Sequence, residues 1–541
     1  MNSLYFGDNL EVLRESIKDE SVDLVYLDPP FNSKRDYNLL FKTPKGEESS
    51  AQITAFEDSW HWGHQAEHEF QEVITGQNTS IAELLMALRG FLGANDVLAY
   101  LTMMANRLIE LHRVLKPTGS IYLHCDPTAS HYLKLVMDGI FGPENFLNEI
   151  IWKRTGAHSS AKRYGPVHDV ILFYGKTSEF SWTDVRLNYS EDYLNKYYKY
   201  DDGDGRLYWR NSITAAGTRN GSSGKPWRGF DPAGQGSHWK FSGEHLEELE
   251  AKGLIYWPPK GGWPQIKRYR DELKGLAVGD LWDDIDKINP SGSERLGYPT
   301  QKPLALLERI IQASSNPGDV VLDPFCGCGT AVDAAQKLGR QWIGIDITHL
   351  AVSLIEKRMK DRYQGILFDI HGTPKDLAGA TNLAERDKYQ FQWWACSLVE
   401  AQPFGGKKKG ADGGIDGLRY LGDVQNGKPV TQKVLVSVKG GGTNAAHVRD
   451  LRGVLEREKG AIALFVTLEK PSKPMLTEAA EAGFFLAGNG KEYPRLQILT
   501  IEDLFGGKRP LIPDMSLNTM TFKKAAPHKK EQPGATPLFD E

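Results

Sequence analysis

Cysteine is scarce in this sequence, with four among 541 residues. So few thiols cannot form the dense disulfide scaffold of a small secreted protein, and they fit a reducing compartment. Cys326 and Cys328 are two positions apart, but no second pair and no nearby histidine accompanies them. A zinc site is therefore not expected.

Long apolar runs are also lacking. No stretch approaches the roughly 18 apolar residues of a membrane helix. The first residues, MNSLYFGDNLEVL, contain no basic segment followed by an apolar one, as a secretion signal would. We therefore expect a cytoplasmic protein with no membrane partner.

An excess of positive charge is missing as well. The chain has 65 Lys and Arg against 70 Asp and Glu, which gives a net charge of −5. Over the whole chain, this balance argues against a general polyanion binder. With 40% hydrophobic and 25% charged residues, the composition is that of a globular protein. Its length suits three or four domains of roughly 150 residues.

Short apolar runs alternate with amphipathic stretches through much of the chain. The run at residues 22–27 ends at Asp28-Pro29-Pro30, and a helical stretch around residues 98–115 ends at Lys116-Pro117-Thr118-Gly119. Such alternation predicts an α/β fold with a parallel, Rossmann-like sheet. The other strands predicted for this sheet are residues 120–123, 170–174, 320–322 and 342–345.

Two regions depart from this pattern. Residues 175–290 are rich in Trp, Tyr, Gly and Ser and show poor periodicity, which indicates an inserted, loop-rich module. A new unit begins near Tyr389, and residues 511–541 are rich in Lys, Pro and Ala, which predicts a flexible tail. The further elements predicted in these regions are helices at 243–252 and 391–400 and strands at 433–439 and 461–467.

A glycine loop marks one candidate site. Residues 319–330 read DVVLDPFCGCGT and precede a helical stretch. A strand that runs into a Gly-x-Gly turn lets the backbone approach a bound cofactor closely, because a Cβ would obstruct that approach. The next predicted strand ends at Asp346, whose carboxylate can accept hydrogen bonds from two ribose hydroxyls. A plain tight turn is the alternative, and Asp346 favours the cofactor site.

The second candidate motif is Asp28-Pro29-Pro30-Phe31. A carboxylate at a strand end, two prolines that fix φ and an aromatic side chain form a preorganised polar turn. Alone, this tetrapeptide suits an ordinary strand-ending turn equally well. In combination with the glycine loop it becomes specific.

Together, these motifs resemble the β class of amino-methylating DNA methyltransferases, in which the Asp-Pro-Pro-aromatic motif precedes the target-recognition region and the Phe-x-Gly-x-Gly motif follows it. The chain has Asp28 first and Phe325-Cys326-Gly327-Cys328-Gly329 after the aromatic-rich module. The resemblance covers roughly residues 2–362. Further matches are Gly7-Asp8-Asn9, residues 148–153 and Thr300-Gln301-Lys302-Pro303; Tyr37-Asn38 and Asp58-Ser59-Trp60 are similar to type III modification subunits.

The resemblance implies S-adenosylmethionine as cofactor and assigns roles to residues. Asp28 and the Pro29 carbonyl would accept the hydrogens of an exocyclic amine, and Phe31 would stack on a target base flipped out of the duplex. Asp in the first motif position favours adenine over cytosine. The catalytic residues implied are Asp28, Pro29, Pro30 and Phe31, and the cofactor-binding ones are Asp8, Lys302, Asp323, Pro324, Phe325, Gly327, Gly329, Thr330 and Asp346.

The C-terminal unit resembles an Mrr-like restriction endonuclease domain of the PD-(D/E)XK type. Asp416 would be the Mg²⁺-binding carboxylate and Lys439, at the end of a predicted strand, would polarise the attacking water. Two residues depart from that family: Gln392 replaces a helix carboxylate, and Ser437 stands where Glu or Gln is usual. Fewer carboxylates mean weaker metal binding, so the sequence leaves an active and a degenerate centre open.

These observations lead to a site-specific DNA adenine-N6 methyltransferase fused to a nuclease-like domain, with double-stranded DNA as partner. The alternatives are a DNA-cleaving effector that uses the methylase fold for target recognition, and an amino-methyltransferase acting on cytosine or RNA. The sequence is compatible with a homodimer of this protein. The predicted domains are a catalytic half at 1–174, a target-recognition module at 175–290, a cofactor-binding half at 291–370, a nuclease-like domain at 385–510 and the tail at 511–541.

Overall fold

The computed structural model describes residues 2–30, 36–42, 48–57, 61–156, 164–289, 294–296, 298, 300–404, 414–425 and 428–513. They divide into two compact units. The first contains the described residues up to Thr183 and from Asp280 onward, and the second is Asp184–Gly279. Within the described ranges, no helix has the length and apolar character needed to cross a membrane.

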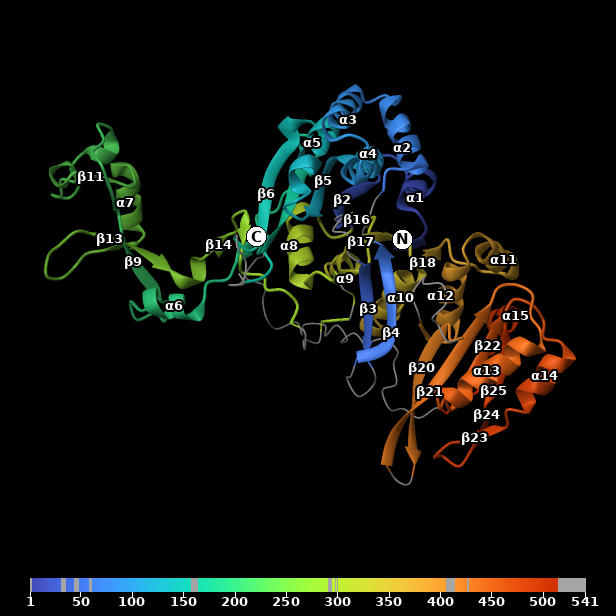
Figure 1. The fold of residues 1–541 in the computed structure, drawn as a ribbon. Coiled ribbons are helices and arrows are strands. Elements are labelled where there is room, and N and C mark those ends of the chain that lie inside the picture. Colours follow the sequence, from blue (N-terminus) through green and yellow to red (C-terminus); the bar gives the residue numbers. More distant parts are fainter. Residues whose placement is uncertain are drawn as a thin grey trace. The chain divides into compact units, whose positions relative to one another are not determined.

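A nine-stranded sheet forms the centre of the first unit (Figure 1). Strand β7 runs antiparallel to β5 and β6, and the other neighbouring strands pair in parallel. The predicted α/β fold with a mostly parallel sheet is therefore confirmed. In spatial order the strands are β15 (Leu281–Trp282), β6 (Phe146–Lys153), β7 (His168–Gly175), β5 (Leu115–Cys125), β2 (Val22–Leu27), β16 (Val320–Asp323), β17 (Gln341–Asp346), β1 (Ser3–Phe6) and β18 (Asp369–His371).

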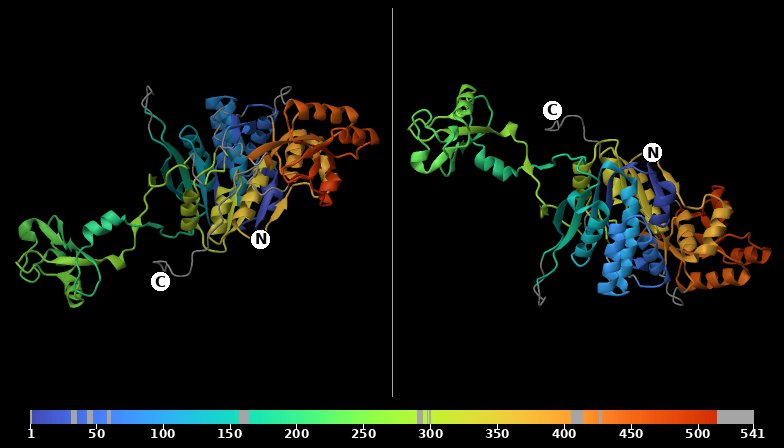
Figure 2. Two further views of the ribbon diagram at one scale, coloured as in Figure 1. Left: turned by 90° about the horizontal axis from the view of Figure 1, so that it is seen from below. Right: turned by 90° about the horizontal axis from the view of Figure 1, so that it is seen from above.

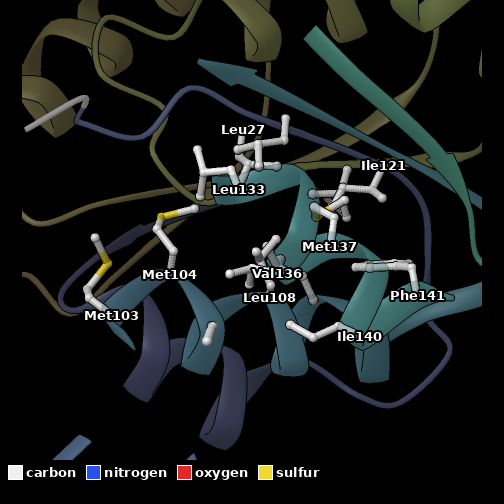
Figure 3. Packing of buried hydrophobic residues seen from close by; sticks show 14 of the residues in the cluster. Leu27, Met103, Met104, Leu108, Ile121, Leu133, Val136, Met137, Ile140 and Phe141 are labelled. Carbon is white, nitrogen blue, oxygen red and sulfur yellow. The ribbon is translucent and has the colours of Figure 1, made fainter. Parts of the chain in front are cut away.

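Helices pack on this sheet (Figure 2). Helix α4 begins after Asn95, whose side chain accepts a hydrogen bond from the Leu98 amide and so satisfies a free donor of the first turn. Its apolar face is buried with α5 against the strands, as Leu27, Met104, Leu108, Ile121 and Val136 show (Figure 3). The helices are α1 (Asn9–Ser16), α2 (His64–Ile74), α3 (Thr79–Leu92), α4 (Asp96–Val114), α5 (Ser130–Phe141), α8 (Leu304–Ser314), α9 (Thr330–Lys337) and α10 (His349–Arg362).

One boundary differs from the sequence-based prediction. Helix α4 ends at Val114, and strand β5 begins directly at Leu115, five residues before the strand predicted at residues 120–123. The pairing of β5 with β2 is irregular here, because Val22 pairs with Leu115 and Leu24 pairs with Ser120. Such an irregularity lets a segment with Pro117 and Gly119 remain in a strand.

The second unit is built around its own small aromatic core. Trp227 and Trp239 are 6% and 1% exposed and pack with Leu246 of α7. These two tryptophans therefore stabilise the unit internally instead of presenting free faces to bases. Its elements are β8 (Arg186–Leu187), α6 (Glu191–Tyr197), β9 (Tyr208–Ser212), β10 (Thr214–Ala216), β11 (Ser237–Trp239), α7 (Gly243–Ala251), β12 (Ile255–Tyr256), β13 (Gln265–Tyr269) and β14 (Leu276–Ala277).

A smaller α/β region follows the nine-stranded sheet, as predicted. Its five strands are ordered β19-β20-β21-β22-β25, and β21 starts at Lys428, earlier than its pattern indicated. The bounds are α11 (Leu377–Arg386), α12 (Lys388–Leu398), β19 (Gln402–Pro403), β20 (Gly417–Gln425), β21 (Lys428–Lys439), α13 (Ala445–Arg457), β22 (Ile462–Thr467), α14 (Lys473–Ala480), β23 (Phe484–Leu486), β24 (Glu492–Pro494), β25 (Leu496–Thr500) and α15 (Ile501–Phe505). Strands β3 (Asp36–Lys42) and β4 (Glu48–Glu57) form a separate hairpin.

Candidate active site

The two motifs meet because their strands are neighbours. Strands β2 and β16 pair in parallel, with Leu24 beside Val321 and Val25 beside Leu322. The carboxyl ends of parallel strands lie at one edge of the sheet, which is where α/β proteins bind ligands. A cavity of about 1150 Å³ opens at this edge, beyond the ends of β1, β2, β16 and β17.

The residues predicted for this site converge on the cavity. Gly329 lies in the glycine loop at the start of α9, and Phe31 lies outside the described residues. The predicted residues that line the cavity are Asp8, Asp28, Pro29, Pro30, Lys302, Asp323, Pro324, Phe325, Gly327, Thr330 and Asp346. The structure thus places them together, and their roles stay predictions.

The glycine loop turns tightly at Gly327 and Gly329, where φ is +49° and +75°. These left-handed conformations favour glycine. A Cβ on Gly327 would lie 3.2 Å from the Tyr298 ring, and one on Gly329 would lie 2.7 Å from Ile355. The loop therefore needs glycine both for its backbone conformation and for its packing.

Asp346 fixes this loop from the neighbouring strand. One carboxylate oxygen accepts a hydrogen bond from the Gly327 amide at 2.9 Å, and the other accepts from the Thr348 amide and hydroxyl at 2.9 and 2.8 Å. Burial raises the pKa of Asp346 to about 6, although these hydrogen bonds oppose the shift. The carboxylate is thus oriented toward the cavity and changes charge near neutral pH.

One of the two carboxylate oxygens of Asp28 has a hydrogen-bond partner. Its Oδ2 accepts from the Lys302 ammonium, and both side chains are largely buried, with exposures of 15% and 11%. Its Oδ1 is buried and has no hydrogen-bond partner among the described residues. A buried acceptor without a donor is costly unless a ligand supplies one. Asp28 can therefore accept a hydrogen bond from a molecule in the cavity.

Arg107 is a cavity residue that the sequence analysis missed. It lies on the buried face of α4 and donates to both Asp8 oxygens, at 3.0 and 3.2 Å, and to Asn9 at 2.6 Å. Asn9 in turn donates to the Pro324 carbonyl at 2.8 Å, which ties the end of β1 to the glycine loop. The available signal was a charged residue within the largely apolar stretch LTMMANRLI.

The candidate residues of the C-terminal region also come together. Lys439 Nζ lies 3.7 Å from Asp416 Oδ2, which accepts hydrogen bonds from Ser437 Oγ at 3.1 Å and from the Val438 amide at 2.7 Å. Asp416 Oδ1 accepts from the Gln392 side-chain amide at 3.1 Å. The two departures from the nuclease pattern therefore donate to the very carboxylate expected to bind the metal.

This cluster does not fit a Mg²⁺ ion. Magnesium needs several oxygen ligands, usually one or two carboxylates with substrate phosphates and water. Around Asp416, Gln392 presents its NH₂ group and Ser437 its hydroxyl hydrogen, so both act as hydrogen-bond donors to the carboxylate and not as oxygen ligands beside it. Among the described residues, no group of three or more His, Cys, Asp or Glu could hold a metal ion.

Comparison with protein families identifies two regions. Residues 22–357 match the sequence model of a family described as DNA methylase, named for N6 and N4 methylation. Residues 402–505 match a family described as NACHT-associated inactive Restriction Endonuclease 1.

Several relatives are restriction–modification proteins. The chain is 31% identical to the type II methyltransferase M.EcaI of Enterobacter cloacae over 66% of the chain and 69% of that protein. It is 28% identical to the StyLTI Mod subunit, a type III restriction–modification enzyme of Salmonella typhimurium, over 63% of the chain and half of that subunit. A putative DNA modification methylase of Thermus thermophilus, solved with S-adenosyl-L-methionine, is 17% identical to the chain, with a TM-score of 0.34. The match covers 69% of this chain and 98% of that protein.

The glycine loop yields a stability prediction. We expect Gly329→Ala to lower the free energy of unfolding by roughly 2–5 kcal/mol, because it adds a clash with Ile355 to left-handed strain. Gly339→Ala is the matched control, since Gly339 has a φ of +72° but open space around its Cβ position. It should lose only about 1–2 kcal/mol. Equal losses in urea denaturation would show that packing at Gly329 is unimportant.

Proposed function

Since the chain belongs to the DNA methylase family whose model spans residues 22–357, we propose that it transfers a methyl group from S-adenosylmethionine to the exocyclic amine of adenine at specific sites in double-stranded DNA. The observation that supports this proposal most directly is the buried Oδ1 of Asp28 beside the cavity, which has no hydrogen-bond partner among the described residues. The preference for adenine is supported by Asp at the first position of the Asp-Pro-Pro motif.

The cavity residues suit this cofactor. A volume of about 1150 Å³ holds a nucleoside with an amino-acid tail and leaves space for part of a base. Asp346 is oriented for ribose hydroxyls, and the glycine loop leaves the backbone open to close approach. Asp8 and Lys302 offer charged groups to the adenine and methionine ends. When bound, the cofactor supplies an electrophilic methyl group.

The protein's task is to make the amine nucleophilic. The lone pair of an adenine amine is delocalised into the ring, so the nitrogen attacks poorly. Hydrogen bonds from the amine to Asp28 Oδ1 and to the Pro29 carbonyl would draw the lone pair out of conjugation and aim it at the methyl carbon. The Asp28 carboxylate would also accept the proton that the nitrogen gives up on methylation. Lys302 holds the carboxylate in place.

Removal of the Asp28 carboxylate tests this function. We expect Asp28→Ala to reduce transfer of labelled methyl to duplex DNA by about 10²–10³-fold or more, as for the loss of one preorganised polar group. Asp126→Ala is the matched control, because Asp126 also precedes a proline after a strand but does not line this cavity. Identification of the methylated nucleoside distinguishes N6-methyladenine from N4-methylcytosine. Equal labelling by wild type and Asp28→Ala would refute the proposal.

The raised pKa of Asp346 predicts how cofactor affinity varies with pH. Below about pH 6 the side chain becomes protonated and loses acceptor strength for ribose hydroxyls. The Kd for S-adenosylmethionine should therefore be flat between roughly pH 7 and 8 and rise about tenfold by pH 5. Asp346→Asn should bind weakly with little pH dependence. Calorimetric titration measures both, and a flat wild-type curve would contradict the assignment.

We further propose that the C-terminal region binds no catalytic Mg²⁺ and does not cleave DNA. The support is that Gln392, Ser437 and the Val438 amide all donate hydrogen bonds to Asp416, and that the region matches a family described as inactive.

A plasmid assay tests this negative proposal. Wild type should leave unmodified plasmid intact in Mg²⁺, whereas the double substitution Gln392→Glu and Ser437→Glu should gain Mg²⁺ binding in calorimetry by adding two carboxylates. Adding Asp416→Ala to that pair is the control and should remove the gain. Mg²⁺-dependent cutting by wild type that disappears in Lys439→Ala would overturn the proposal.

A further inference from the structure

One wall of the cavity comes from outside the methylase match. Arg386, Asp387, Gln390 and Trp393 line the same cavity as Asp28 and Asp346, yet they follow the matched residues 22–357. They belong to the end of α11 and to α12, which also packs against the C-terminal sheet. From this we propose that α12 completes the cofactor site and links it to the Asp416 cluster, so that cofactor binding stabilises the C-terminal region. This inference rests on the function proposed above.

Gln390 is positioned at the cavity by a contact with His349. Its Oε1 accepts a hydrogen bond from the His349 amide at 3.3 Å, and the His349 ring is itself fixed by stacking on Phe6 with centroids 3.5 Å apart. Phe6 and Thr348, on either side of this contact, both line the cavity. The Gln390 side chain is therefore held against the wall formed by the ends of β1 and β17.

Trp393 anchors the same face of the helix. It is 6% exposed and packs with Tyr298, Cys328, Leu350 and Leu354. Tyr298 in turn lies against the glycine loop, where a Cβ on Gly327 would approach its ring. Residues 390 and 393 share a helix face because they are three positions apart. This face thus contacts both the loop and the helix α10 that border the predicted cofactor position.

The other side of α12 belongs to the C-terminal region. Gln392 donates to Asp416 Oδ1, and Cys396, four positions further, donates to the Asp416 carbonyl at 3.5 Å. Phe391 and Trp394 are 1% and 4% exposed. Helix α12 therefore lies between α10 and strands β19 and β21 (Figure 1). Asp387 caps its first turn by accepting from the amides of Tyr389 and Gln390.

Because α12 packs against structure on both of its sides, a contact that fixes one side of the helix also restrains the other side. A ligand that contacts Gln390 stabilises the conformation in which Gln390 faces the cavity, and the same conformation places Gln392 on Asp416. By linkage, a ligand that binds only this arrangement must stabilise both of its sides. Cofactor binding should therefore slow local opening of α12 and of the strands that hold Asp416.

Hydrogen exchange of the full-length chain tests the link, with S-adenosylhomocysteine as a probe that cannot donate a methyl group. We expect the probe to slow exchange in residues 320–346 and also in 388–398 and 414–425. Gln390→Ala should weaken probe binding by about tenfold, the value of one hydrogen bond, and should remove the added protection in the C-terminal segments at saturation. Arg386→Ala, an exposed position, is a second variant expected to weaken binding.

Ser397→Ala is the matched control on the same helix, because the Ser397 hydroxyl donates to the Trp394 carbonyl of α12 and the residue does not line the cavity. It should bind the probe as wild type does and show the same protection. Protection confined to residues 320–346, or unchanged affinity in Gln390→Ala, would overturn the inference while leaving the methylase proposal standing. Failure of wild type to bind the probe at all would overturn both.

Discussion

The ion pair between Asp28 and Lys302 is the interaction on which the site depends. It joins residues 274 positions apart in the chain, and both side chains are largely buried. Lys302 occupies one carboxylate oxygen, and no residue in the described part of the chain donates to the other. In a low-dielectric cavity, an acceptor fixed in this way binds a hydrogen-bond donor strongly, because it needs no reorganisation. The same pair ties the segment before α8 to the end of β2.

Sheet topology explains why the sequence could predict most of this site. Each motif stands directly after an apolar run, and parallel strands bring their carboxyl ends to one edge. Asp8, Asp28, Asp323 and Asp346 therefore converge although they come from distant parts of the chain. What the sequence could not predict comes from helices. Arg107 and Gln390 reach the cavity through the rotation of α4 and α12. A charge within an apolar stretch marks Arg107, but no local pattern marks Gln390.

In the C-terminal region, the sequence pattern predicts where the residues lie but not their chemistry. The sequence predicted that Asp416, Lys439, Gln392 and Ser437 belong to one site, because the helix and the strand end could be recognised from their patterns. In the structure these side chains lie together. Their chemistry differs from the nuclease pattern because an amide and a hydroxyl are donors where carboxylates would be metal ligands. Asp416 consequently acts as an acceptor that binds α12 to β21. Its hydrogen bonds hold the helix and the strand together.

Helix α12 is held by contacts on both of its sides. The Gln392 amide donates to Asp416, and this hydrogen bond keeps the helix in contact with β21. On its opposite side the helix packs against α10 and the glycine loop through Trp393. The position of Gln390 therefore depends on the C-terminal sheet as well as on α10, so the two regions share one packing arrangement instead of being joined only by a linker.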